Sequence, residues 1–145
     1  MLRKLGSWGA GVLLLGLAVG CADRDVDDAR DTTAIVTATA SVTDIDLGRT
    51  LNPDKTITDV LDTFRPADTL YASVETDAPG TVTLVGRWTF EDGQVVEESS
   101  QTVSAAGKQR TEFHVMRPGG WPTGKYKFEV LLDGKPAGSK EFKIE

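Results

Sequence analysis

The stretch Thr81–Phe90, TVTLVGRWTF, carries the clearest structural pattern in this sequence. Its large apolar residues and one glycine share a single parity: Val82, Leu84, Gly86, Trp88 and Phe90. Threonines and an arginine fill most of the alternate positions, and Val85 is the exception. Because successive side chains of a β-strand point to opposite faces, this alternation predicts a strand with one buried face.

The same period of two recurs along most of the remaining chain. It predicts strands near residues 35–47, 55–59, 69–75, 81–90, 94–103, 108–116, 125–132 and 137–144. Asp92-Gly93 and Asp133-Gly134 fall between neighbouring strands, and Asp-Gly pairs supply the positive φ angles that tight hairpins need. Short antiparallel strands at this spacing indicate an all-β fold, a sandwich of seven or eight strands.

Two features of these strands resemble the immunoglobulin-like and fibronectin-type-III-like modules of bacteria. Trp88 lies in the middle of what would be strand C, where such folds often bury a tryptophan. The segment Pro122–Gly124 precedes Tyr126, as in the Pro-x-Gly-x-Tyr opening of their penultimate strand, where the tyrosine can hydrogen-bond back to the loop. The resemblance covers Thr69–Glu145 and implies an immunoglobulin-like antiparallel β-sandwich without the disulfide of antibody domains. It implies no activity, because sandwiches host many functions.

The N-terminal residues have the features of a secretory signal that ends in a lipidation site. A basic segment precedes an apolar run of about a dozen residues, which is too short to span a bilayer. The run leads into Ala18-Val19-Gly20-Cys21, which resembles the lipobox of bacterial lipoproteins, although Ala18 stands where leucine is preferred. We therefore expect residues 1–20 to be a signal peptide that is cleaved between Gly20 and Cys21.

The lipobox resemblance implies a diacylglyceryl thioether on Cys21, and two or three acyl chains of the palmitate type anchor a protein stably in membrane lipid. Ala22 replaces the aspartate that is associated with inner-membrane retention in proteobacteria, so the outer membrane is favoured in an organism that has one. The alternative is ordinary signal cleavage at the same bond, since Ala18–Gly20 also fits a small-x-small pattern. Cys21 would then be a free thiol on a soluble, secreted protein.

Residues 21–33 are expected to form the lipidated cysteine and a disordered tether, and residues 34–145 the sandwich. The tether reads ADRDVDDARDTT after the cysteine and contains a single large apolar residue, Val26. Such a segment cannot bury enough apolar surface to offset the entropy of ordering. A short amphipathic helix is the alternative for this segment.

Charge and composition exclude several classes of function. The net charge is −6, and it becomes −8 once Arg3 and Lys4 are removed with the signal peptide. This balance gives no general attraction for nucleic acid or for anionic lipid surfaces. One cysteine cannot form an internal disulfide, and one histidine cannot build a multi-histidine zinc site. We expect no cofactor, no metal and no catalytic residues.

The loop Arg117–Pro122, RPGGWP, is the most unusual stretch outside the strands. An exposed Trp121 beside Arg117 can stack on a sugar ring or anchor a protein, so this loop is the candidate partner-binding site. The alternative is that Trp121 folds back and closes the open end of the sandwich.

Other candidate groups have simpler interpretations. His114 lies on the polar parity of its strand and is interpreted as a surface histidine. The adjacent carboxylates of Glu97 and Glu98 point to opposite faces of a strand and cannot act as an acid/base pair without a bulge. Aspartates between Asp44 and Asp62 offer oxygen ligands, but the sequence contains no recognisable calcium loop.

The sequence therefore predicts a non-catalytic, membrane-anchored envelope lipoprotein whose immunoglobulin-like module binds a protein or glycan partner. The alternative is a structural or assembly subunit that joins an envelope complex through an edge strand. An enzyme is the least expected outcome, because it would need a pocket in which carboxylates converge with His114.

Overall fold

The computed structural model describes residues 38–104 and 106–145. The predicted signal peptide, the lipidation site at Cys21 and the acidic tether lie outside the described residues. The first part of the strand expected near residues 35–47 lies outside them too, and the strand itself is seen from Ser41 onward.

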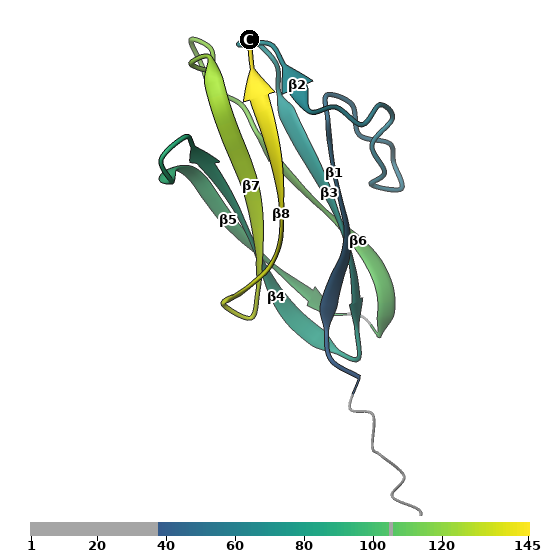
Figure 1. The fold of residues 1–145 in the computed structure, drawn as a ribbon. Coiled ribbons are helices and arrows are strands. Elements are labelled where there is room, and N and C mark those ends of the chain that lie inside the picture. The colour runs from purple at the N-terminus through teal and green to yellow at the C-terminus, as the bar shows by residue number, and fades with distance from the viewer. Residues whose placement is uncertain (1–37, 105) are drawn as a thin grey trace, which may run out of the picture. The chain divides into compact units, whose positions relative to one another are not determined.

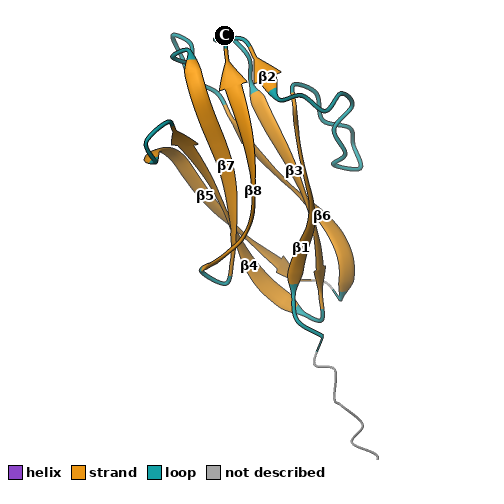
Figure 2. Ribbon diagram, viewed as in Figure 1, coloured by secondary structure: helices purple, strands orange, loops and turns teal. Residues whose placement is uncertain are grey.

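The described residues form eight strands in two sheets, with no helix (Figures 1 and 2). The strands are β1 (Ser41–Gly48), β2 (Thr63–Phe64), β3 (Leu70–Ala78), β4 (Thr81–Phe90), β5 (Gln94–Ser104), β6 (Gly107–Val115), β7 (Gly124–Leu132) and β8 (Lys135–Ile144). One sheet has the order β1-β3-β6, and the other has the order β2-β8-β7-β4-β5. The pairs are antiparallel, except that the short β2 runs parallel to β8.

This topology corresponds to strands A, B and E of the immunoglobulin sandwich in one sheet and strands C, F and G in the other. β5 extends the second sheet beyond β4. The short β2, which follows β1 in the sequence, pairs with β8 at the other edge of this sheet. The fold is an immunoglobulin-like β-sandwich. Only two residues separate β5 from β6, so the position that strand D takes beside strand E is vacant among the described residues.

Aromatic side chains fill the core between the sheets. The ring centroids of Trp88 and Phe128 lie 4.4 Å apart, and Phe142 meets Trp88 edge-on at 5.8 Å. Phe113 of the opposite sheet packs against Phe128 at 5.8 Å. Gly86 allows this packing, because a Cβ atom there would lie 2.7 Å from the Phe113 ring. The buried Trp88 expected in the C position is therefore confirmed.

The strand expected near residues 55–59 does not form, and this prediction is wrong. The chain makes a compact loop there, in which a single bridge joins Leu51 to Ile57. Asp54 accepts hydrogen bonds from the backbone N–H and the hydroxyl of Thr56, which bends the chain instead of extending it. The strand that pairs in this region is the short β2, several residues later.

The two ends of the sandwich differ in their connections. Two-residue turns join the strands at one end, the hairpin end, at 79–80 and 133–134, and β5 ends and β6 begins at the same end. The longer connections, 49–62, 65–69, 91–93 and 116–123, gather at the other end, the loop end. Asp133 and Gly134 have φ of 49° and 83°, as the predicted Asp-Gly turn requires. β1 begins at the hairpin end, where Ser41 pairs with Asp77.

Candidate functional site

The loop that the sequence singled out begins with a tight turn at the loop end. The N–H of Gly120 donates to the carbonyl of Arg117 at 3.0 Å, and Gly119 has a φ of 89°. Proline at the second position and a glycine with positive φ at the third are the features of a type II turn. The turn therefore holds the exposed Arg117, two residues after the end of β6, in a fixed backbone geometry.

Trp121 is 4% exposed, so the expectation that it stands out from the loop is wrong. Its indole N–H donates to the carbonyl of Asp68 at 3.1 Å, and its backbone N–H donates to the carbonyl of Pro66. The ring meets Tyr126 edge-on at 5.8 Å. Burial of this large ring with its N–H satisfied is more favourable than exposure. The alternative interpretation, in which Trp121 closes the end of the sandwich, describes the structure.

Tyr126 secures the loop as the immunoglobulin-like resemblance implies. Its hydroxyl donates to the carbonyl of Pro122 at 2.8 Å. Burial raises the pKa of Tyr126, while the charge of Arg117 lowers it and that of Glu91 raises it slightly further. The hydroxyl therefore stays protonated and remains a donor to the loop at physiological pH.

A groove of about 470 Å³ lies next to this loop, between the start of β5 and the end of β6. Its lining residues are mostly apolar: Phe90, Gln94, Val95, Val96, Glu97, Val115, Met116, Arg117, Trp121, Pro122 and Tyr126. Val95 is 50% exposed and Met116 is 64% exposed. We call this feature the distal groove, because it opens at the loop end, away from the start of β1.

The distal groove lies on the side of the sandwich formed by β5 and β6, the edge strands of the two sheets. Near the hairpin end, Val103 closes this side and is 5% exposed. Next along β5 towards the loop end, the amide of Gln101 donates to the backbone carbonyl of Glu112 and bridges the sheets. Closer still to the loop end, Ser99 and Glu97 are exposed, and no strand covers them among the described residues. The seam between β5 and β6 is therefore closed at the hairpin end and open at the loop end.

A β-bulge shapes the β5 wall of the distal groove. The pairing of β4 with β5 shifts between Trp88 and Thr89, so that Val96 is an extra residue in β5. Val96 is half-buried and packs against the core, which leaves Val95 at the surface. Bulges commonly re-aim side chains in this way beside functional sites.

The charges around the distal groove are unpaired. Arg117 and Glu97 both line it, and neither forms an ion pair with any described residue. Glu98 differs, since it lies on the other face of β5 and pairs with Arg87 at 2.7 Å. The sequence prediction that Glu97 and Glu98 point apart therefore agrees with the pairing of β4 and β5. The groove presents one free charge of each sign.

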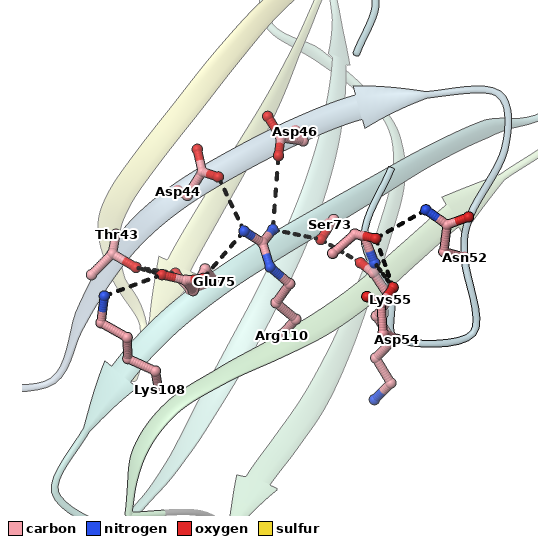
Figure 3. A network of polar contacts seen from close by, with 11 residues as sticks. Thr43, Asp44, Asp46, Asn52, Asp54, Lys55, Ser73, Glu75, Lys108 and Arg110 are labelled. Atoms are coloured by element: carbon pink, nitrogen blue, oxygen red, sulfur yellow. Dashed lines mark hydrogen bonds and ion pairs between the residues drawn. The ribbon is translucent and has the colours of Figure 1, made fainter. Parts of the chain in front are cut away.

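A second polar feature, centred on Arg110, lies on the outer face of the three-stranded sheet (Figure 3). The Arg110 guanidinium lies 3.2 Å from Glu75, 3.4 Å from Asp44 and 3.7 Å from Asp46. It also donates to the hydroxyl of Ser73 at 3.1 Å. Three carboxylates and one hydroxyl therefore engage the guanidinium in a single network.

The Arg110 network fastens the 49–62 loop onto the sheet. The hydroxyl of Ser73 donates to the backbone carbonyl of Lys55, which links the network to the loop. Burial raises the pKa of Asp46, and the adjacent charge of Asp44 raises it further. Hydrogen bonds from Thr56 lower the pKa of Asp54. This network is consistent with a structural role.

A second hollow, of about 620 Å³, lies on the outer face of the five-stranded sheet at the loop end. Lys125 pairs directly with Lys143 across β7 and β8, and like charges in this position oppose each other. Lys143 is compensated by Glu145 at 2.9 Å, and this hydrogen bond raises the pKa of Lys143. Because Asp62 and Glu141 also line the hollow, it has no consistent sign of charge and carries no candidate site.

The remaining candidates take simple positions. His114 is exposed on β6, and its Nδ1 lies 3.0 Å from Glu112; His114 lines neither hollow. Within the described part of the chain, no three His, Cys, Asp or Glu residues are arranged to hold a metal ion. None of the described residues form a helix long and apolar enough to cross a membrane.

Comparison with known proteins gives a likeness of fold. No protein-family model matches the chain, and no curated protein matches its sequence. An alkylpurine DNA glycosylase from Pseudomonas fluorescens, solved with DNA containing an abasic-site analogue, aligns with 74% of this chain at a TM-score of 0.51 and 13% identity. This chain spans 31% of the length of that enzyme, and so low an identity shows a shared fold alone. An immunoglobulin-like protein from Pseudomonas aeruginosa aligns over 76% of this chain and 99% of its own length, at a TM-score of 0.48 and 12% identity.

The sequence identified Arg117 and the loop, but it missed Val95 and Met116. The doublet Val95-Val96 interrupts the alternation of apolar and polar residues in its strand, and this interruption coincides with the bulge. Met116 follows the buried Val115 directly and therefore falls on the exposed parity. Neither residue can be recognised as part of a site from the sequence alone, because the sequence does not show that β5 and β6 lie on the same side of the sandwich.

Proposed function

We propose that this protein is a non-catalytic lipoprotein of the cell envelope, held to membrane lipid through acylated Cys21, whose immunoglobulin-like module binds another protein. The distal groove carries the proposal. Of the three large hydrophobic side chains exposed among the described residues, two, Val95 and Met116, lie at this one feature. Exposed apolar side chains gathered beside a hollow and rimmed by charges are typical of protein contact sites.

The position of the distal groove suits a tethered protein. The first strand begins at Ser41 at the hairpin end, whereas the groove opens at the loop end. The tether expected at residues 21–33 precedes this strand in the sequence, and the strand starts at the end of the sandwich remote from the groove.

A protein partner is better supported than a glycan. Glycan stacking by this loop depends on an exposed Trp121, and that ring is buried with its N–H engaged. The charged rim supplied by Arg117 and Glu97 is suited to side chains of both signs. The acidic balance of the whole chain gives no support for nucleic acid as the partner.

The proposal is tested by site-specific photo-cross-linking in the envelope of cells that make the full chain. A photo-reactive phenylalanine analogue replaces Val95 in one variant and Met116 in another. A third variant carries the analogue at Gly80, in a hairpin-end turn where an added Cβ atom meets no atom within 4 Å. We expect the same protein to be cross-linked from positions 95 and 116, and no cross-link to it from position 80.

The specificity of the cross-link is checked with Met116→Asp in the variant that carries the analogue at position 95. Met116 is 64% exposed, so this change leaves the core intact, which circular dichroism and thermal unfolding verify. A charge placed in the groove should reduce the cross-link yield at least several-fold, because a desolvated carboxylate is unfavourable in an apolar contact. Equal yields from positions 80 and 95, or a yield indifferent to Met116→Asp, would contradict the proposed site.

A further inference from the structure

The vacant strand position beside β6 adjoins the distal groove. The three-stranded sheet ends at β6, while the five-stranded sheet ends at β5, so β5 projects past the edge of the opposite sheet. Gly86 faces Phe113 across the core, and therefore its cross-strand neighbour Ser99 lies on the inner face of β5. Ser99 is nevertheless exposed, as are Glu97 and Gln101 on the same parity. The inner face of β5 thus lacks the cover that a fourth strand on β6 would give.

The main chain of β6 is available along the same edge. The carbonyl of Glu112 points away from β3, because it accepts the side-chain amide of Gln101 across the seam. In an antiparallel strand the main-chain groups of alternate residues point to the same side. The N–H and carbonyl of His114 therefore also face the open edge of β6, next to Val115, which lines the distal groove. Gln101 caps one of these acceptors in the same way as an added strand would.

We propose that the partner binds by strand addition at β6, over the uncovered inner face of β5; this inference rests on the protein-binding function proposed above. The occupant is an extended protein segment, because main-chain pairing supplies affinity and alternate side chains supply specificity in this mode. Charge complementarity defines its chemistry. An apolar side chain enters between Val95 and Met116, a carboxylate meets Arg117, and a basic side chain meets Glu97.

The parity of β5 provides a sharp test with a matched control. Ser99 lies on the inner face, whereas its neighbour Ser100 pairs with Val85 and lies on the outer face, and both are exposed. The photo-reactive analogue replaces each serine in turn in the anchored, full-length protein. A strand added to β6 lies against the inner face only. We expect position 99 to cross-link the protein that positions 95 and 116 capture, and position 100 to give a yield at least several-fold lower.

A second variant addresses the main-chain edge. Gln101→Ala frees the carbonyl of Glu112, so a partner strand no longer has to displace the glutamine amide, and the cross-link yield from position 95 should rise several-fold. Mass spectrometry of the cross-linked peptides should place the contacts from positions 95 and 99 in one continuous segment of the partner.

The outcomes separate the two proposals. Cross-links from 95 and 116 without one from 99 leave the distal groove in place and overturn strand addition. Equal yields from Ser99 and Ser100 assign the partner to the edge of β5 and overturn the assignment to β6. Capture of a second copy of this chain overturns the partner chemistry stated here. Absence of any cross-link from all four positions overturns the proposed function together with this inference.

Discussion

The carboxylate of Asp46 shows how a single residue of the Arg110 network should respond to pH. Burial, and then the charge of Asp44, raise its pKa above the value of 3.8 for an unperturbed aspartate. A raised pKa means that the fold favours the protonated form. The favourable contribution of this group is present below the unfolded pKa and is lost as the pH rises through the folded pKa. At neutral pH the ionised Asp46 therefore opposes folding.

We predict that Asp46→Asn raises the free energy of unfolding at pH 7, by less than about 1 kcal/mol, because partly exposed charge interactions have this scale. The gain should vanish near pH 3, where the wild-type carboxyl is protonated as well. Urea unfolding of both proteins across this pH range measures the difference. Asp44→Asn is the companion variant, since loss of its charge should move the pKa of Asp46 towards its ordinary value in an NMR titration. A stability difference that does not vary with pH would contradict this account.

At the scale of the element, the contact between β4 and β6 depends on Gly86. A Cβ atom there would lie 2.7 Å from Cδ1 and 2.9 Å from Cγ of Phe113, closer than side chains pack. We predict that Gly86→Ala lowers the free energy of unfolding by about 1–3 kcal/mol, the usual effect of overpacking a core. Gly80→Ala is the control, because a Cβ atom at Gly80 meets nothing within 4 Å. Equal losses for the two variants in denaturant unfolding would show that the Phe113 contact is not the cause.

The strands differ in how far the sequence could predict them. β4 and β7 were predictable because burial of one face imposes a period of two on the local sequence, which needs no knowledge of the rest of the fold. Residues 55–59 have a strand-like composition, but they are bent by Asp54 and fixed by the hydroxyl of Ser73, which is distant in the sequence. A local sequence pattern contains no information about such a long-range contact, so the strand prediction failed there.

The candidate site was less predictable than the strands for a related reason. The distal groove results from the unequal width of the two sheets, which follows from strand order and not from any local motif. Arg117 was identified because its loop has an unusual composition. The burial of Trp121 depends on acceptors in the 65–69 loop, the carbonyls of Pro66 and Asp68, that meet it only in the folded chain.

At the scale of the whole molecule, the proposal requires that the lipid on Cys21 is what holds the protein in the membrane. The mature chain carries a net charge of −8 after loss of Arg3 and Lys4, so its surface is not attracted to anionic lipid. Acyl chains contribute about 0.8 kcal/mol for each buried CH₂, which makes an anchor with two or three chains stable against dilution and salt. The prediction is that the protein stays with membranes in high salt and leaves them only in detergent.

The matched variant is Cys21→Ser, which removes the thioether and changes no described residue of the sandwich. We expect this variant to appear in the soluble fraction or to retain its signal peptide, because lipoprotein processing requires the modified cysteine. Mass spectrometry of the wild-type N-terminus should show Cys21 carrying a diacylglyceryl group. A free thiol at that position would instead identify a secreted, soluble protein, and the distal groove would then have to find its partner by diffusion. In that case the position of the groove, at the end remote from the start of β1, would have no significance for a membrane tether. The photo-cross-links from Val95 and Met116 would still test the groove as a protein-binding site.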